Sequence, residues 1–280
     1  MANALVFGYH DVGVRCLGAL LDAGVSVPLV VTHRDDPRER IWFGSVAALA
    51  HAKGIETLLD PDPAALPGRV RAAAPDFIFS FYYRRMLAPE LIALAKRGAY
   101  NMHGSLLPKY RGRAPVNWAV LRGETETGAT LHEMVAKPDA GRIVDQESVA
   151  IGPDDTAAEV FARVTDAAEV VMRRSIGPLV AGTARLRPNE LAKGSYFGGR
   201  RPEDGRIDWT KSAREIHNLV RAVAPPYPGA FCDRLNVHRT QITERSAPGR
   251  QPGAYHERGE WFALCGDGKV LRLVEVQERK

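Results

Sequence analysis

The sequence predicts an α/β fold, with a doubly wound, mostly parallel sheet of Rossmann-like type followed by a small β-rich C-terminal subdomain. Two observations favour this fold class. Short apolar runs alternate with segments of helical periodicity over residues 1–190, a pattern typical of parallel sheets with right-handed crossovers. Beyond residue 206, strand-like runs follow one another after a single helical segment.

The first strand and helix can be placed from the spacing of their apolar residues. Residues 4–7 form an apolar run that ends at Gly8, and residues 12–23 carry apolar side chains at helical spacing before Gly24. This pattern predicts a strand, a turn and a helix. The same alternation predicts further strands over 25–32 and 76–81 and a helix over 44–53.

The next segments continue the alternation. A short helix is expected over 89–97, with Pro89 in its first turn, and a strand over 98–103 that Gly104 ends. Two further strands, 128–135 and 142–151, flank a loop that contains Pro138, Asp139 and Gly141, and a helix is expected over 156–176.

The chain is expected to divide into a catalytic domain, 1–190, a linker, 191–205, and a C-terminal subdomain, 206–280. The region before residue 206 is rich in Arg, Gly, Pro and Lys and lacks a sustained period. The subdomain is predicted to hold one helix and several strands, over 212–222, 236–243, 261–264 and 269–274.

Composition limits the possible classes of protein. The chain has 280 residues, 45% hydrophobic and 25% charged, with a net charge of +5, so it can bury a full core. Its cysteines, Cys16, Cys232 and Cys265, are far apart and odd in number, which indicates neither a disulfide framework nor a zinc site. No secretory signal or long apolar stretch occurs. We therefore expect a soluble cytoplasmic protein without a membrane partner or a bound metal.

Polar residues gather at two predicted strand ends, where ligands bind in parallel sheets. Asn101 and His103 alternate along one strand and so lie on the same face, and Asp139 follows in a small-residue loop. An amide donor, an imidazole and a carboxylate suit acyl transfer: Asn101 would stabilise the oxyanion, His103 would move a proton, and Asp139 would raise the pKa of His103. Alternatively, His103 is a structural histidine and Asp139 a turn residue.

Residues 101–143, with the motif Asn-x-His-x-Ser-Leu-Leu-Pro and an Asp in a small-residue loop, resemble the central block of the folate-dependent formyltransferase family. The resemblance implies the formyltransferase fold, Asn101, His103 and Asp139 as the catalytic trio, and 10-formyltetrahydrofolate as the formyl donor. It also implies donor contacts, which are listed here: Arg85, Met86, Leu87, Arg113, Val135, Ala136, Lys137, Pro138 and Asp139.

Within that family the sequence is most similar to the branch that formylates UDP-4-amino-4-deoxy-L-arabinose, an activity of lipid A modification and polymyxin resistance. The segments that carry this similarity include 79–84, 109–115 and 197–202. It implies formyl transfer to the primary amine of a nucleotide-linked amino sugar. Arginines in glycine-bearing loops could supply bidentate contacts to phosphate, or could be solvated loop charges; these are Arg111, Arg113, Arg200 and Arg201.

Two alternatives remain open: a methionyl-tRNA formyltransferase and a non-catalytic folate-binding module. A nucleic-acid partner is not expected, because no broad basic stretch with aromatic residues stands out after residue 206. No Gly-x-Gly-x-x-Gly loop occurs, so NAD is not expected and the chain is not expected to make its own amino-sugar substrate. His132-Glu133 lacks the second histidine of a metalloprotease motif, and we assign His132 to a strand face.

Overall fold

The computed structural model describes residues 2–279, which fold into two compact units. Unit 1 comprises the described residues up to Gly112 together with Gly128–Val149 and Arg163–Tyr196. Unit 2 comprises Arg113–Thr127, Ala150–Ala162 and the described residues from Phe197. The chain thus passes between the units several times, and the simpler division at 191–205 stays a prediction.

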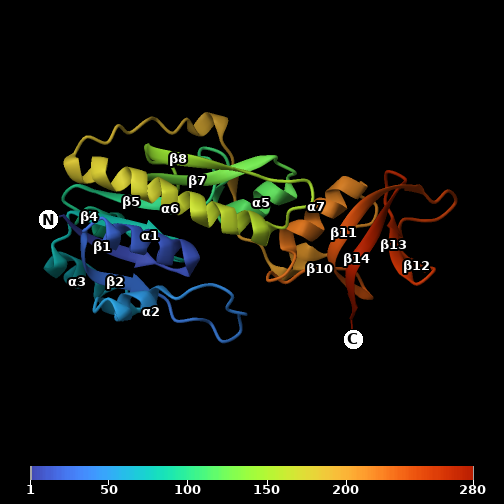
Figure 1. The fold of residues 1–280 in the computed structure, drawn as a ribbon, viewed down its shortest axis with the longest axis horizontal. Helices are drawn as coiled ribbons and strands as arrows, with labels where there is room; N and C mark the ends of the chain where they lie inside the picture. The colour runs from blue at the N-terminus through green and yellow to red at the C-terminus, as the bar shows by residue number, and fades with distance from the viewer. Residues whose placement is uncertain (1, 280) are drawn as a thin grey trace. The chain divides into compact units, whose positions relative to one another are not determined.

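A seven-stranded sheet is the centre of unit 1, in the order β3-β2-β1-β4-β5-β7-β8 (Figure 1). β1 pairs in parallel with both β2 and β4, β5 pairs in parallel with β4, and β7 runs antiparallel to β5. The sheet is therefore mostly parallel, as predicted. Its strands are β1 (Asn3–Gly8), β2 (Ser26–Thr32), β3 (Glu56–Leu59), β4 (Phe77–Phe81), β5 (Gly98–His103), β7 (Glu126–Glu133) and β8 (Ile143–Ala150).

Helices connect and cover these strands. They are α1 (His10–Asp22), α2 (Val46–Ala52), α3 (Leu66–Ala73), α4 (Pro89–Ile92) and α6 (Ala157–Ala181). The central strands are apolar along their whole length because helices cover both faces: every residue of β4 is buried, and Leu5 and Ile78 pair side by side with no exposed surface.

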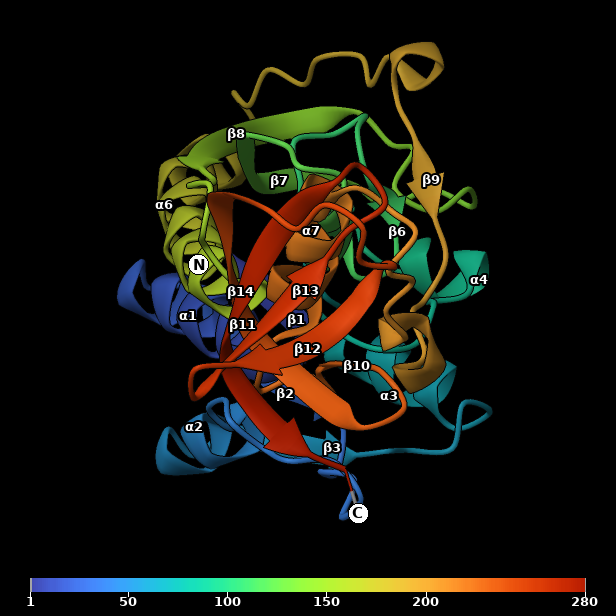
Figure 2. The same ribbon diagram turned by 90° about the vertical axis from the view of Figure 1, so that its right-hand side faces the viewer.

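Unit 2 is built on a five-stranded antiparallel sheet with the order β10-β11-β14-β13-β12, which faces the viewer in Figure 2. Its strands are β10 (Ala230–Phe231), β11 (Leu235–Ser246), β12 (Gly253–Glu257), β13 (Glu260–Leu264) and β14 (Lys269–Glu278), and its helices are α5 (Pro115–Leu121), α7 (Ala213–Val223) and the short η2 (Pro202–Gly205). α7 packs Ile216 and Val220 against this sheet. Ser212 and Glu215 form a capping box that fixes its first turn.

The predicted elements differ from the structure mainly in extent. The helix expected over 89–97 is confined to α4, and the helix expected over 156–176 continues to Ala181. The predicted linker contains a one-turn helix, η1 (Leu191–Lys193), and a strand, β9 (Tyr196–Phe197), which pairs with β6 (Arg111–Gly112). Among the described residues no helix is long and apolar enough to cross a membrane.

Candidate active site

Asn101 and His103 lie at the carboxyl end of β5, between β4 and β7. Their cross-strand partners on antiparallel β7 are His132, opposite Asn101, and Thr130, opposite His103. Directly opposed side chains of an antiparallel pair share a face of the sheet. The register therefore brings a second imidazole, that of His132, beside the two residues that the sequence predicted.

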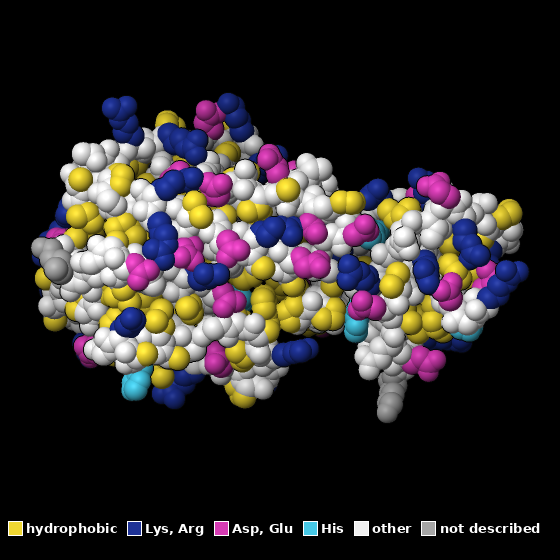
Figure 3. All heavy atoms as spheres, in the orientation of Figure 1, with side chains coloured by type: hydrophobic (Ala, Val, Ile, Leu, Met, Phe, Trp, Pro, Cys, Tyr) yellow, Lys and Arg dark blue, Asp and Glu magenta, His cyan; other side chains and the backbone are white. Residues whose placement is uncertain are grey.

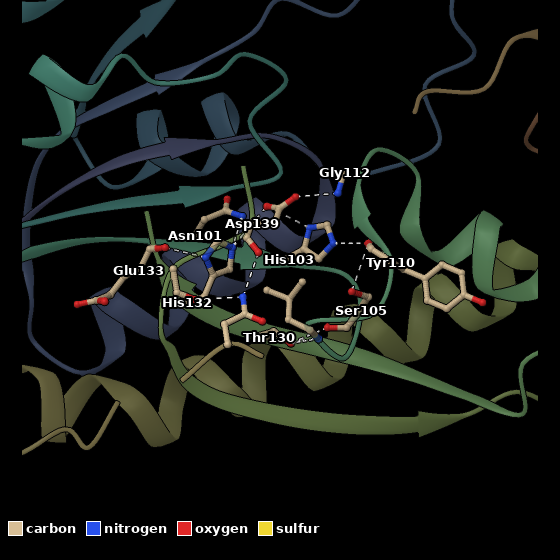
Figure 4. A network of polar contacts seen from close by, with 12 residues as sticks. Asn101, His103, Ser105, Tyr110, Gly112, Thr130, His132, Glu133 and Asp139 are labelled. Carbon is tan, nitrogen blue, oxygen red and sulfur yellow. Dashed lines mark hydrogen bonds and ion pairs between the residues drawn. The ribbon is translucent and has the colours of Figure 1, made fainter. Parts of the chain in front are cut away.

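Asp139 reaches this cluster from the loop between β7 and β8 (Figure 4). Its Oδ1 lies 3.6 Å from Nδ1 of His103 and 3.5 Å from Nε2 of His132. The backbone N–H of Gly112 donates to its Oδ2 at 2.8 Å. The structure thus brings Asn101, His103 and Asp139 together, although 38 positions separate Asn101 from Asp139 in the sequence (139 minus 101).

The ring of His103 is buried between two oxygen acceptors. Its Nε2 lies 2.8 Å from the carbonyl oxygen of Tyr110, and its Nδ1 faces the carboxylate of Asp139. A neutral imidazole has one N–H and can satisfy only one of these acceptors, whereas the imidazolium donates to both. The surroundings of His103 therefore stabilise the ring after it accepts a proton.

His132 fixes the orientation of Asn101. Its Nδ1 lies 2.8 Å from the carbonyl oxygen of Glu133, so the hydrogen-bond partners place the proton on Nδ1 and leave Nε2 as an acceptor. The Nδ2 of Asn101 donates to this Nε2 at 3.1 Å. An amide nitrogen carries two N–H groups, so Asn101 keeps a second donor while its side chain is held in place.

Electrostatics maintain a charged Asp139 beside a neutral His103. Burial alone would raise the pKa of Asp139, but attraction to the protonated ring of His103 and the N–H of Gly112 outweigh it and hold that pKa well below its usual range. Burial lowers the pKa of His103, and the Asp139 carboxylate and the Tyr110 carbonyl oppose this effect. At neutral pH the ring can therefore act as a base whose protonated form has a counter-ion.

Hydrogen bonds within the loop after β5 leave Ser105 no role as a nucleophile. Ser105 has no exposed surface, and its hydroxyl donates to the carbonyl oxygen of Lys109 at 2.6 Å. Thr130 donates from Oγ1 to the carbonyl oxygen of Ser105, also at 2.6 Å. These contacts secure the loop that carries Tyr110 and Gly112, which both contact the candidate site.

The predicted donor-binding residues other than Arg113 lie in two loops of unit 1. Met86, after β4, and Val135, after β7, are large apolar side chains with 68% and 42% of their surface exposed. Leu87 is buried in a core cluster against which the partly buried Met134 packs. The guanidinium of Arg85 forms an ion pair with Asp60 at 3.2 Å. The other predicted positions of the second loop are exposed at Ala136 and Lys137 and half-buried at Pro138.

The four arginines predicted to bind phosphate differ in their surroundings. Arg111, in unit 1, is only 8% exposed, yet no ion pair or side-chain hydrogen bond joins its guanidinium to any residue of the described range 2–279, and its covered Nε has no partner there. In unit 2, Arg200 lies over the ring of Trp118 at 4.9 Å. Arg113 and Arg201 are exposed.

His132 is the site residue that sequence reasoning missed. Its strand was predicted correctly, but the partner strand and the register that set it opposite Asn101 carry no mark in a single sequence. A metal site has no support within residues 2–279, where no group of three or more His, Cys, Asp or Glu side chains is arranged to hold an ion.

Solved structures with the same fold cover essentially the whole chain. An N-formyltransferase from Helicobacter canadensis, in complex with folinic acid and dTDP-3-aminofucose, is 21% identical, with a TM-score of 0.79 and full coverage of both chains. The sugar 3N-formyl transferase WlaRD, determined with dTDP and 5-N-formyl-THF, is 19% identical with a TM-score of 0.78, covering 99% of this chain and 98% of its own. HypX from Aquifex aeolicus is 18% identical with a TM-score of 0.67, and the match covers 100% of this chain and 45% of HypX.

Family profiles agree with the chemistry of the site. The profile described as formyl transferase matches residues 4–176, and the formyl transferase C-terminal domain matches residues 200–280. The first match contains Asn101, His103 and Asp139. Because the two matches together span most of the sequence, the chain belongs to the formyl transferase family.

Proposed function

We propose that this protein transfers a formyl group from 10-formyltetrahydrofolate to the primary amine of a nucleotide-linked amino sugar. One observation carries the proposal: in a formyl transferase family member, Asn101, His103 and Asp139 form a single polar cluster at the carboxyl end of β5. The structures of similar fold from Helicobacter canadensis and of WlaRD support the substrate class, since they hold formyl-folate compounds with dTDP-3-aminofucose or dTDP.

In the proposed reaction the amine nitrogen bonds to the formyl carbon, and the bond between that carbon and N10 of the donor breaks. The free N–H of Asn101 stabilises the negative charge that develops on the formyl oxygen, an effect of about 3 kcal/mol. His103 accepts the proton that leaves the amine and returns it to N10. Asp139 stabilises the imidazolium between these two steps.

Exposed apolar side chains fit the proposed donor. Met86 and Val135 are exposed apolar side chains on the two predicted donor loops, and each could contact the pterin ring of the donor. The backbone of Arg85, Met86 and Leu87 and of the loop Val135–Asp139 would supply polar contacts. Arg113, which is exposed in unit 2, is a further candidate donor contact.

Arg111 supports an anionic acceptor. A buried guanidinium without an acidic partner is costly, and a diphosphate would satisfy it through bidentate hydrogen bonds. We propose Arg111 as a phosphate ligand, with Arg200 and Arg201 as further candidates. The finer proposal is UDP-4-amino-4-deoxy-L-arabinose as acceptor, from the resemblance to the formyltransferase domain of ArnA, which would place the protein in lipid A modification and polymyxin resistance.

The face shown in Figure 3 agrees with a small-molecule acceptor. Lys and Arg side chains alternate there with Asp and Glu. Over α1 and α6, for example, Arg15 pairs with Asp166 and Glu169, and Arg173 with Asp22. This face therefore offers no broad basic area of the kind that binds a nucleic-acid backbone.

The experiment is incubation of the full-length chain with 10-formyltetrahydrofolate and a panel of UDP- and dTDP-linked amino sugars, read as a mass gain of one formyl unit. Charged initiator tRNA is tested in parallel, and Asn101→Ala is the matched inactive control. We expect formylation of at least one nucleotide sugar, with UDP-4-amino-4-deoxy-L-arabinose foremost. Formylation of the tRNA alone would contradict the proposal and indicate a methionyl-tRNA formyltransferase. Folate binding without turnover would indicate a non-catalytic module.

A further inference from the structure

The loop that carries Asp139 has an unusual backbone. Asp139 adopts a left-handed conformation, with φ of +49°, which non-glycine residues rarely adopt unless their surroundings hold them there. Two residues later the loop passes very close to β7, because a Cβ on Gly141 would lie 2.0 Å from the carbonyl oxygen of Glu133. Contacts from outside the loop can stabilise this shape.

Asn189 supplies such contacts. Its Nδ2 donates to the carbonyl oxygen of Asp139 at 3.0 Å and to that of Gly141 at 3.1 Å. The segment that carries Asn189 is itself fixed to the start of β8, since Arg187 and Ile143 exchange both backbone hydrogen bonds at 2.9 Å. A side chain 50 positions further along the sequence thus joins both ends of the Asp139 turn.

We infer that Asn189 is a positioning residue that holds the Asp139 carboxylate against His103. The Asp139 carboxylate itself is contacted by the Gly112 N–H, which donates to its Oδ2 at 2.8 Å, and its Oδ1 faces the rings of His103 and His132. The Asn189 contacts position the backbone from which the Asp139 side chain extends, and the Gly112 contact orients its carboxylate group. Without Asn189 the left-handed turn can relax and the carboxylate can move away from the imidazole.

The chemistry of the side chain agrees with this role. One amide nitrogen supplies two N–H groups, the number needed for two carbonyl oxygens. The Oδ1 of Asn189 is buried and has no partner among residues 2–279. The hydrogen bonds of the Asn189 side chain among these residues are therefore the two that it donates to the Asp139 turn.

A double-mutant cycle tests the inference, with rates that rest on the proposed function. Asn189→Ala is expected to lower kcat about tenfold to a hundredfold, the effect of an ångström-scale misplacement, and to leave the KM values within about threefold. In an Asp139→Asn background the same change should have almost no further effect, because Asn189 acts through the carboxylate. Equal losses in both backgrounds would overturn the inference.

Arg187→Ala is the matched control. It removes the side-chain bond from Arg187 to Gln146 in the same segment and leaves the bonds to Asp139 and Gly141 intact. Its kcat should stay near that of the wild type, and a loss as large as that of Asn189→Ala would mean that the segment matters only for folding. If Asn189→Ala does not fold, Asn189→Ser, which keeps one donor, carries the same comparison.

A readout without turnover separates this inference from the proposed function. In ¹⁵N NMR titrations of the His103 ring, Asn189→Ala should lower the pKa of His103, because the carboxylate that opposes the effect of burial has moved away. Arg187→Ala should not. A shift of this kind would uphold the inference even if no acceptor were formylated, and an unchanged His103 titration would refute it whatever the activity.

Discussion

Replacing Asp139 by asparagine tests the central electrostatic feature of the site. The change removes the negative charge but preserves shape, and the oxygen of the new amide can still accept from the Gly112 N–H. In the wild type the carboxylate lies 3.6 Å from Nδ1 of His103. It stabilises the imidazolium that forms when His103 accepts the proton of the amine, and an amide stabilises that ion far less.

The distance sets an upper limit on the effect. Two unit charges at 3.6 Å interact by about 4 to 5 kcal/mol at an effective dielectric constant of about 20. If the whole interaction were lost in the transition state, kcat would fall by about a thousandfold, at 1.36 kcal/mol for each factor of ten. We expect a fall of about a hundredfold to a thousandfold, within the range of general acid–base catalysis.

The pH dependence of kcat tests the direction of the change in the His103 pKa, independently of how far kcat falls. The neutral form of His103 is the base, so activity rises with pH through the pKa of His103. The Asp139 charge opposes the lowering of this pKa by burial, so Asp139→Asn lowers the pKa further and moves the acidic limb of the kcat profile to lower pH. The assay is release of tetrahydrofolate over a pH series. A kcat within about threefold of the wild type, with an unmoved acidic limb, would refute the reasoning.

Three further variants test other parts of the site. His132→Phe removes the acceptor that orients Asn101 and should lower kcat about tenfold to a hundredfold with little change in folate affinity, measured by titration calorimetry. Arg111→Met should raise the KM for the nucleotide sugar and leave the KM for the folate unchanged, and equal changes in both would argue against a phosphate contact. Gly141→Ala places a Cβ 2.0 Å from the carbonyl oxygen of Glu133 and should lower both the melting temperature and kcat; a wild-type melting curve would show that the loop is less tightly packed than described.

The acid stability of the fold follows from the same carboxylate. Because the pKa of Asp139 is lowered in the folded protein, its contribution to the free energy of unfolding is present above its unfolded pKa of about 3.9 and is lost as pH falls further. Urea titrations should therefore show that Asp139→Asn is less stable than the wild type at neutral pH. This difference should narrow on acidification below about pH 4, and a constant difference would contradict it.

The sequence predicted the buried parallel strands well because their apolar runs reflect burial on both faces. It missed β3, α3 and α5 for identifiable reasons. β3 (Glu56–Leu59) is a four-residue edge strand with partly exposed side chains, and α3 and α5 are only eight and seven residues long. Segments this short complete at most about two helical turns, so they show no sustained period.

Part of the candidate site could likewise be predicted from the sequence, and part could not. Asn101 and His103 could be assigned to one face because residues two apart in a strand always share a face. The conformation of the Asp139 loop could not be predicted, because it depends on hydrogen bonds from Gly112 and Asn189, which lie 27 and 50 positions away. Contacts over such separations leave no local pattern. The roles of the predicted donor and phosphate contacts stay predictions.

The register of β5 against β7 ties the chemistry of the site to the apolar core. Met102 and Leu131 pair directly and are almost completely buried, while the flanking pairs, Asn101 with His132 and His103 with Thr130, project to the opposite face. A slip of one residue would place polar side chains in the core and apolar ones in the site, at a cost of several kcal/mol for each unpaired polar group. The burial of Met102 and Leu131 therefore disfavours a one-residue slip, which would turn Asn101 and His132 away from the site.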